Sequence, residues 1–150
     1  ENSEKIMQEY ITKNEKETID LGKTLAQQIK VGSIIAITGD LGSGKTIFVK
    51  GLAEGLSIHD HITSPTFTLV HSYEGLNTTL HHFDVYRVSD EDELFEIGFY
   101  EYLYSGDICV IEWAELISGL IPANAVWVHI ERTGNDTDER RITIEGMNLT

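Results

Sequence analysis

The sequence is poor in basic residues, in cysteine, in proline and in long apolar runs. It carries 11 lysines and arginines against 25 acidic residues in 150 positions, which gives a net charge of −14. Proteins hold nucleic acids mainly by pairing Lys and Arg with phosphates, so this composition disfavours direct binding of DNA or RNA. Any work on RNA is therefore expected to be indirect, through a partner that holds the RNA.

The other absences bear on the location and organisation of the chain. Cys109 is the only cysteine, so no internal disulfide can form, and we expect a reducing, cytoplasmic location. There are two prolines and no linker rich in Ser, Gly or Pro, which predicts that residues 1–150 form a single domain. No apolar run approaches the roughly 18–20 residues that cross a bilayer, so no membrane partner is expected.

What the sequence does contain is a glycine-rich loop between an apolar run and an amphipathic run. The segment GDLGSGKT matches the pattern G-x-x-x-x-G-K-[ST]. This pattern indicates a P-loop when a strand precedes it and a helix follows it. Its backbone N–H groups and the N-terminus of the next helix form a cradle for phosphates. Lys45 is expected to reach the β- and γ-phosphates, and the Thr46 hydroxyl to bind Mg²⁺. The predicted cradle consists of Gly39, Asp40, Leu41, Gly42, Ser43, Gly44, Lys45 and Thr46.

Segments of strand and helix character alternate around this loop. The predicted strands are 33–38, 67–73, 80–86, 107–113, 125–132 and 140–146, and the predicted helices are 16–29, 45–56 and a short one ending near Gly98. Asn14 is expected to cap the first helix, and Ser89 with Asp92 to form a capping box for the last. The pattern predicts an α/β P-loop NTPase fold, with a mixed, mostly parallel sheet and helices on both faces.

Two carboxylates follow apolar strand residues where a metal site is expected. Asp84 ends LHHFD and Glu112 ends ICVIE, so both are predicted near Thr46, as metal ligands or as groups that orient the attacking water. The sequence does not divide these roles, and a solvated strand end is the alternative for each. Thr66 and Ser64, in the loop before the next strand, are candidates for sensing the γ-phosphate, with an ordinary β-turn leading into that strand as the alternative.

The histidines do not predict a transition-metal site. His81 and His82 are adjacent and point to opposite faces of a strand, so they cannot easily share an ion. Trp113 directly follows Glu112 and is a candidate to cover the nucleotide pocket, with core packing as the alternative.

Four motifs together resemble the TsaE (YjeE) family of small bacterial P-loop ATPases. They are GDLGSGKT, SPTFTLV, HFDVYR and IEWAE, beginning at residues 39, 64, 82 and 111. The resemblance implies an ATPase required for N6-threonylcarbamoyladenosine (t6A) at position 37 of tRNAs that read ANN codons. It implies ATP and Mg²⁺ as cofactors, and TsaD and TsaB as protein partners that deal with the tRNA.

The same resemblance implies roles for individual residues. Residues 40–45 would hold the phosphates, Thr46 and Glu112 would bind Mg²⁺, and Asp84 would be the other acidic residue. Thr12 and Asn14 match a segment near adenine in the family. A family arginine near the nucleotide aligns best with Arg140, with Arg141 one register step away. The residues predicted to act in hydrolysis are Lys45, Thr66, Asp84 and Glu112.

Two other functions remain open at this point. The first is a small-molecule or nucleotide kinase. Such a P-loop enzyme usually needs several arginines in a mobile lid, and only Arg87 precedes the last strands, so hydrolysis coupled to a partner is preferred. A nucleotide-gated binding module with negligible turnover is the other alternative. Because no arginine is obviously placed at the γ-phosphate, we expect slow hydrolysis by the isolated chain.

The acidic and aromatic segment 89–104 is a candidate docking surface, with an inward-packed helix as the alternative.

Overall fold

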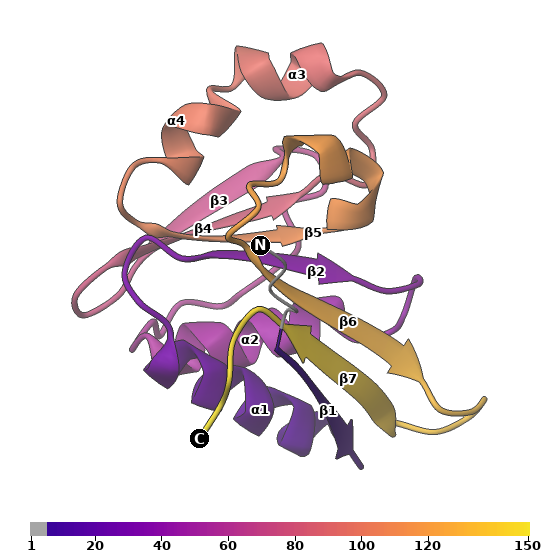
Figure 1. The fold of residues 1–150 in the computed structure, drawn as a ribbon. Coiled ribbons are helices and arrows are strands. Elements are labelled where there is room, and N and C mark those ends of the chain that lie inside the picture. The colour runs from indigo at the N-terminus through magenta and orange to yellow at the C-terminus, as the bar shows by residue number, and fades with distance from the viewer. Residues whose placement is uncertain (1–5) are drawn as a thin grey trace.

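A computed structural model describes residues 6–150 of the chain, which form one seven-stranded sheet between two layers of helices (Figure 1). The strands are β1 (Met7–Thr12), β2 (Ile34–Thr38), β3 (Val70–Glu74), β4 (Thr79–Asp84), β5 (Ile108–Glu112), β6 (Val126–Arg132) and β7 (Arg140–Glu145). Their order across the sheet is β1-β7-β6-β2-β5-β4-β3. The strand that precedes the P-loop, β2, therefore lies at the centre.

The sheet is mixed, with a parallel centre. Strands β6, β2, β5 and β4 are all parallel neighbours, and β7 and β3 pair antiparallel at the two sides. Strand β1 is antiparallel to β7 and so runs in the same direction as the central four. Five of the seven strands thus share one direction, which confirms the predicted mixed, mostly parallel sheet.

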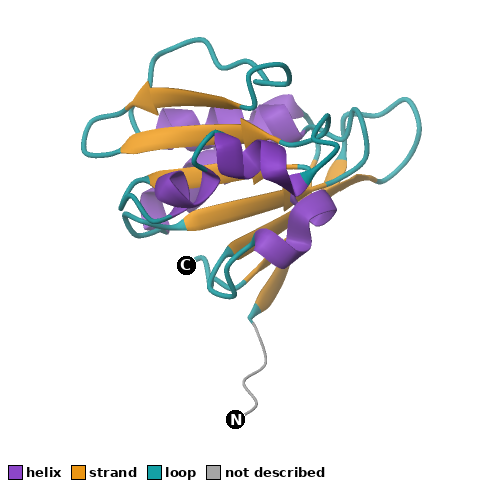
Figure 2. Cartoon of the chain, turned by 90° about the horizontal axis from the view of Figure 1, so that it is seen from above, coloured by secondary structure: helices purple, strands orange, loops and turns teal. Residues whose placement is uncertain are grey.

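Helices cover both faces of this sheet, as predicted. They are α1 (Glu15–Gln28), α2 (Lys45–Gly55), α3 (Glu91–Glu96), α4 (Phe99–Leu103) and the 3₁₀ helix η1 (Ala114–Leu120). Helices α1 and α2 lie on one face, and α3, α4 and η1 lie on the other (Figure 1). Viewed from above, helices are seen both in front of the strands and behind them (Figure 2). Among residues 6–150, no helix is long and apolar enough to cross a membrane.

Side chains along β2 alternate between the two faces of the sheet and so pack in both layers of the core. Ile35 and Ile37 pack with the buried side chains of α1 and α2, whereas Ile34 and Ala36 pack with those of α3, α4 and η1. A strand with apolar residues on both faces is typical of the buried centre of a parallel sheet. The apolar run in front of the P-loop therefore anchors that loop to the rigid middle of the molecule.

Glycines allow α1 and α2 to approach closely. A Cβ on Gly51 would lie 2.1 Å from the carbonyl oxygen of Ile19, and one on Gly22 would lie 2.5 Å from that of Phe48. The backbones of the two helices are thus in direct contact at these positions. Because α2 begins at Lys45, this contact fixes the helix that carries two of the P-loop residues.

Several local predictions are confirmed and two are wrong. The strand predicted from residue 67 begins only at Val70, because residues 66–69 form a turn in which the Leu69 N–H donates to the Pro65 carbonyl. The Asn14 side chain caps α1 by accepting from the Glu17 N–H at 2.9 Å, and β3 and β4 form the predicted hairpin. The predicted Ser89–Asp92 capping box is wrong, because Asp90 caps α3 and accepts from the Asp92 N–H. The Ser89 hydroxyl instead donates to Glu93 at 2.8 Å.

Candidate nucleotide site

The P-loop joins the end of β2 to the start of α2. Gly42 and Gly44 adopt φ values of 76° and 105°, in the left-handed region that favours glycine. Gly44 is also the N-cap residue of α2. The first amide groups of a helix have no partner within the helix and face outward from its N-terminus. The loop therefore directs backbone donors and the positive end of the α2 dipole to one place.

Lys45 is buried within this loop, with 5% of its surface exposed. Its Nζ donates to the carbonyl oxygens of Gly39 and Asp40, at 2.6 and 2.9 Å. It also lies 3.9 Å from the centre of the Trp113 ring, a favourable cation–π distance. Burial lowers the pKa of the Lys45 ammonium, opposed chiefly by the negative charge of Glu112. Two of three ammonium donors are bonded to the loop itself, so the charge is held at the base of the cradle.

Trp113 reaches this position through an unusual backbone conformation. Its φ is 64° and its ψ is 32°, which is left-handed backbone at a bulky residue. Such a conformation costs of order 1–3 kcal/mol and is found most often at functional sites. The ring lies 4.5 Å from that of Tyr86. The two rings form an aromatic wall beside the Lys45 ammonium.

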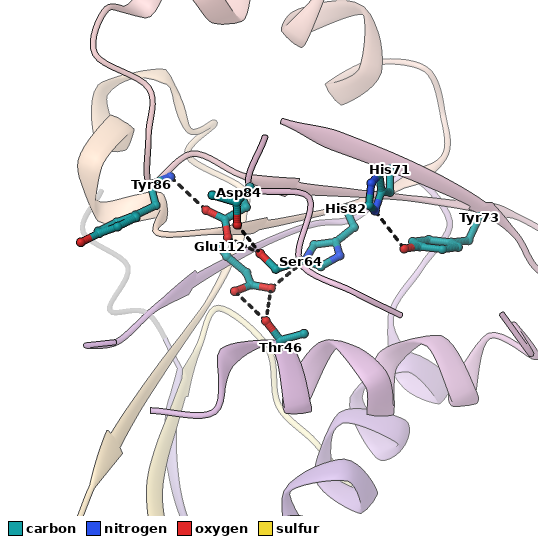
Figure 3. Close-up of polar contacts among 9 residues, drawn as sticks. Thr46, Ser64, His71, Tyr73, His82, Asp84, Tyr86 and Glu112 are labelled. Atoms are coloured by element: carbon teal, nitrogen blue, oxygen red, sulfur yellow. Dashed lines mark hydrogen bonds and ion pairs between the residues drawn. The ribbon is translucent and has the colours of Figure 1, made fainter. Parts of the chain in front are cut away.

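Two buried carboxylates lie at the carboxyl ends of adjacent strands. Asp84 on β4 is the register partner of Glu112 on β5, and they are 4% and 2% exposed. The Thr46 hydroxyl donates to Glu112, at 3.2 Å from Oε1 and 3.0 Å from Oε2 (Figure 3). The structure thus places Glu112, rather than Asp84, in direct contact with the hydroxyl of the P-loop.

Asp84 is instead held by the loop that precedes β3 and by the backbone that follows β4. The Ser64 hydroxyl donates to Asp84 Oδ2, and the Tyr86 N–H donates to Asp84 Oδ1 at 2.9 Å (Figure 3). The Thr66 hydroxyl lies 3.1 Å from that of Ser64. Both hydroxyl residues proposed from the sequence therefore lie beside the second carboxylate.

These side chains line one open cavity of about 380 Å³. Its lining residues are Glu15, Leu41, Gly42, Gly44, Lys45, Thr46, Ile47, Ser64, Thr66, Asp84, Tyr86, Glu112, Trp113 and Arg140. The cavity brings together the P-loop, both carboxylates and one arginine. Gly39, Asp40 and Ser43 do not line this cavity: the carbonyl oxygens of Gly39 and Asp40 accept from Lys45, and Ser43 is buried.

The structure separates the two candidate arginines. Arg140 Nε donates to the Ser43 carbonyl, and its Nη2 lies 3.4 Å from the Gly42 carbonyl. Arg141 points away and pairs with Glu9 at 2.9 Å. Arg132, the register partner of Arg140, also donates to the Gly42 carbonyl at 3.1 Å. The sequence analysis did not single out Arg132, although a cross-strand partner of Arg140 shares its face.

Thr12 itself does not line this cavity, although the sequence analysis placed it near the nucleotide. The Thr12 side chain is buried, with its hydroxyl 2.7 Å from that of Thr18. Glu15, at the start of α1, is the residue of this segment that lines the cavity. No group of three or more His, Cys, Asp or Glu residues suited to a metal ion lies within residues 6–150. His81 bonds to Ser72 and Asp107, away from His82.

A central parallel sheet, a strand–P-loop–helix unit and buried strand-end carboxylates define the class of P-loop NTPases. A crystal structure of YdiB from Bacillus subtilis superposes with a TM-score of 0.80, at 34% sequence identity, over 98% of this chain and 90% of that one. The family model described as threonylcarbamoyl adenosine biosynthesis protein TsaE matches residues 12–142. The chain belongs to the TsaE family.

Relatives in sequence agree with this assignment. A Bacillus subtilis (strain 168) protein named tRNA threonylcarbamoyladenosine biosynthesis protein TsaE is 42% identical over 136 residues, which are 91% of this chain and 84% of the relative. A protein of the same name from Treponema pallidum (strain Nichols) is 40% identical over 120 residues, covering 80% and 88% of the two chains. The family is one of tRNA t6A biosynthesis, and its P-loop fold supports nucleotide binding.

Proposed function

We propose that this chain binds ATP with Mg²⁺ in the P-loop cavity and hydrolyses it slowly. The hydrolysis supports t6A formation at position 37 of tRNAs that read ANN codons, together with TsaD and TsaB. The single observation that carries the proposal is the contact between the Thr46 hydroxyl and the buried Glu112 carboxylate, inside a cavity that also holds Lys45. The relatives' names supply the pathway.

The donor set of the cavity fits a triphosphate. The buried Lys45 ammonium and the amides at the start of α2 supply positive charge and donors for phosphate oxygens. Arg140 lines the same cavity and ties the loop to β7 through the carbonyls of Gly42 and Ser43. The Trp113 ring, which packs against Tyr86, covers the Lys45 ammonium and shields it from solvent on that face.

The oxygen groups of the cavity fit Mg²⁺. Proteins usually hold this ion through one or two carboxylates and a hydroxyl, together with phosphate oxygens. Thr46 and Glu112 would hold it, and Asp84, with Ser64 and Thr66, would orient the attacking water. When bound, Mg²⁺ neutralises charge that develops on the phosphate oxygens.

Slow hydrolysis by the isolated chain follows from how the arginines are engaged. Arg140 donates to the carbonyls of Ser43, Thr137 and Glu139 and Arg132 to that of Gly42, so both guanidinium groups are bound to the main chain. An arginine that contacts the transferring phosphoryl group contributes roughly 10³–10⁵ in rate. A partner that rearranges or supplements these arginines would therefore raise the rate.

The test is reconstitution of tRNA modification with TsaD and TsaB. Lys45→Ala is expected to lower ATP hydrolysis and t6A formation by about 10²–10³, the effect of losing one transition-state donor. Lys50→Ala, on the same helix but outside the P-loop cavity, is the matched control. Wild-type modification by Lys45→Ala would refute the role, and a phosphorylated small-molecule acceptor would identify a kinase instead.

The docking surface for this partnership is the outer side of α3 and α4. The inner side of these helices is buried through Leu94, Phe99 and Leu103. The outer side carries Phe95, Tyr100 and Tyr104. The ring centroid of Tyr100 lies 5.6 Å from that of Phe95 and 6.2 Å from that of Tyr104. The segment 89–104 has six acidic residues, at positions 90–93, 96 and 101, and no lysine or arginine. Exposed rings beside uncompensated carboxylates suit a partner face that carries basic residues.

Charge reversal tests this surface. Glu91→Lys with Asp92→Lys is expected to weaken capture of a TsaD–TsaB complex by tenfold or more, since like charges across an interface cost several kcal/mol. Glu54→Lys with Asp60→Lys makes the same charge change in and just after α2, a helix that lies on the other face of the sheet. Equal capture by the two double variants would discard the surface.

A further inference from the structure

A buried histidine contacts the carboxylate that serves the P-loop. His82 lies on β4 and is 0% exposed. Its Nε2 lies 2.7 Å from Glu112 Oε2, the oxygen that also accepts from the Thr46 hydroxyl at 3.0 Å (Figure 3). A chain of contacts thus runs from the first turn of α2 through β5 to β4. The sequence analysis weighed His82 as a metal ligand and quoted it as the first residue of the HFDVYR motif, but gave it no role in the site.

Strand geometry brings this contact about. His82 precedes Asp84 by two residues, so both project to the same face of β4. The register partner of His82 on β5 is Val110, and Glu112 lies two residues further along that parallel strand. Val110 packs in the core layer of α1 and α2, so Glu112 projects to the same side. Its side chain reaches diagonally back to the imidazole while its carboxylate meets Thr46.

The polarity of the contact fixes the role of the imidazole. A carboxylate only accepts hydrogen bonds, so the hydrogen of this contact lies on Nε2 of His82. The other ring nitrogen, Nδ1, is buried and has no hydrogen-bond partner within residues 6–150. With Nδ1 unpartnered among the described residues, Nε2 is the ring atom through which His82 acts, and it donates to Glu112 Oε2.

We infer that His82 is a positioning residue, which holds the Glu112 carboxylate in the orientation that serves Thr46 and Mg²⁺. A carboxylate on a three-carbon side chain has several rotamers, and two converging donors select one of them. Groups that bond to a metal ligand in this way typically change metal affinity 10–100-fold when they are lost. The inference rests on the proposed function, because it assumes that Glu112 serves a metal-dependent nucleotide site.

The test is the Mg²⁺ concentration at half-saturation of fluorescent ATP analogue binding, measured on the full chain. His82→Leu keeps a buried side chain of similar size without a donor, and is expected to raise this concentration about tenfold or more. His82→Gln places an amide N–H near the position of Nε2, and is expected to stay within about threefold of wild type. An unchanged Mg²⁺ requirement in folded His82→Leu overturns the inference.

His81→Leu is the matched control. His81 neighbours His82 on the same strand, is buried, and bonds to Ser72 at 2.7 Å and to Asp107 at 2.9 Å, but it points to the other face. The control is expected to lose stability while its Mg²⁺ requirement stays at the wild-type value. An equal rise in Mg²⁺ requirement in both leucine variants would show a structural effect and overturn the positioning role.

Two further measurements keep the inference testable if His82→Leu does not fold. The shorter amide of His82→Asn extends only to the position of Nδ1 and cannot reach Glu112. This variant is therefore expected to have a higher Mg²⁺ concentration at half-saturation than His82→Gln, and equal concentrations overturn the inference. The ¹H–¹⁵N spectrum of the wild-type imidazole is expected to show a hydrogen on Nε2, and a bare Nε2 overturns it. If the wild-type chain binds no nucleotide with Mg²⁺, the proposed function fails, whereas a normal wild type with an unaffected His82→Leu refutes only this inference.

Discussion

Replacing Gly51 by alanine tests whether the contact between α1 and α2 holds the P-loop helix in place. The added Cβ would lie 2.1 Å from the Ile19 carbonyl oxygen and 2.9 and 3.0 Å from Ile19 C and Cα. Ordinary contact begins at 3.4 Å. These atoms belong to a helix backbone and cannot rotate away, so the helices must separate by roughly the 1.3 Å difference.

The expected cost follows from two opposing effects. Overpacking of this kind costs about 1–3 kcal/mol, and a contact with backbone favours the upper end. Alanine in a helix interior recovers about 1 kcal/mol relative to glycine. We expect Gly51→Ala to lower the free energy of unfolding by about 2 kcal/mol, which corresponds to a fall in Tm of roughly 4–8 °C for a domain of this size.

Urea and thermal unfolding followed by circular dichroism measure this change. Gly119→Ala is the control, because a Cβ at Gly119 meets no atom of the described chain within 4 Å. The control is expected to be as stable as the wild type or slightly more stable. A Gly51→Ala variant that unfolds at or above the wild-type temperature would refute the close contact between α1 and α2.

Three further predictions concern single side chains. Arg140→Ala removes a positive charge from the cavity and the bonds to the P-loop carbonyls, and is expected to weaken binding of a fluorescent ATP analogue by about tenfold, roughly the value of one bond to a charged group, whereas Arg141→Ala leaves it near wild type; equal effects would contradict the assigned register. Burial raises the pKa of the Cys109 thiol to about 12 from 9.0, so its contribution to stability is complete below pH 9 and is lost as pH rises toward 12. Between pH 9 and pH 12 the free energy of unfolding of the wild type should therefore fall by about 1.4 kcal/mol per pH unit more than that of Cys109→Ala. Urea unfolding midpoints that change equally with pH in the two proteins would refute this. Adding Mg²⁺ and ATP should change the tryptophan emission of Trp127→Phe but not that of Trp113→Phe, and the reverse would contradict the position of Trp113 at the cavity.

The parts of the fold that local sequence specifies were predictable. The P-loop follows from glycines, a lysine and a threonine at fixed spacing between a strand and a helix, and Asn14 caps α1 through a bond to a residue three positions away. The hairpin of β3 and β4 depends on a short turn. The edge strand β1 was not predicted, because Met7–Thr12 has few strand signals of its own and is held by pairing with the distant β7.

The site could be predicted only as far as residue types and strand ends allow. The sequence places Asp84 and Glu112 at strand ends, but their separate contacts with Ser64 and Thr46 depend on the register of β4 and β5. The choice between Arg140 and Arg141 likewise depends on which face of β7 each occupies. His82 carried a usable signal, because its two-residue spacing from Asp84 places both on one face.

Isothermal titration calorimetry of ATP into the full chain, with and without Mg²⁺, tests the central claim most directly. The account predicts saturable binding at one site that is strengthened by Mg²⁺, weakened in Lys45→Ala and unchanged in Lys50→Ala. A folded wild-type chain that releases no binding heat with ATP and Mg²⁺ at several temperatures would contradict it.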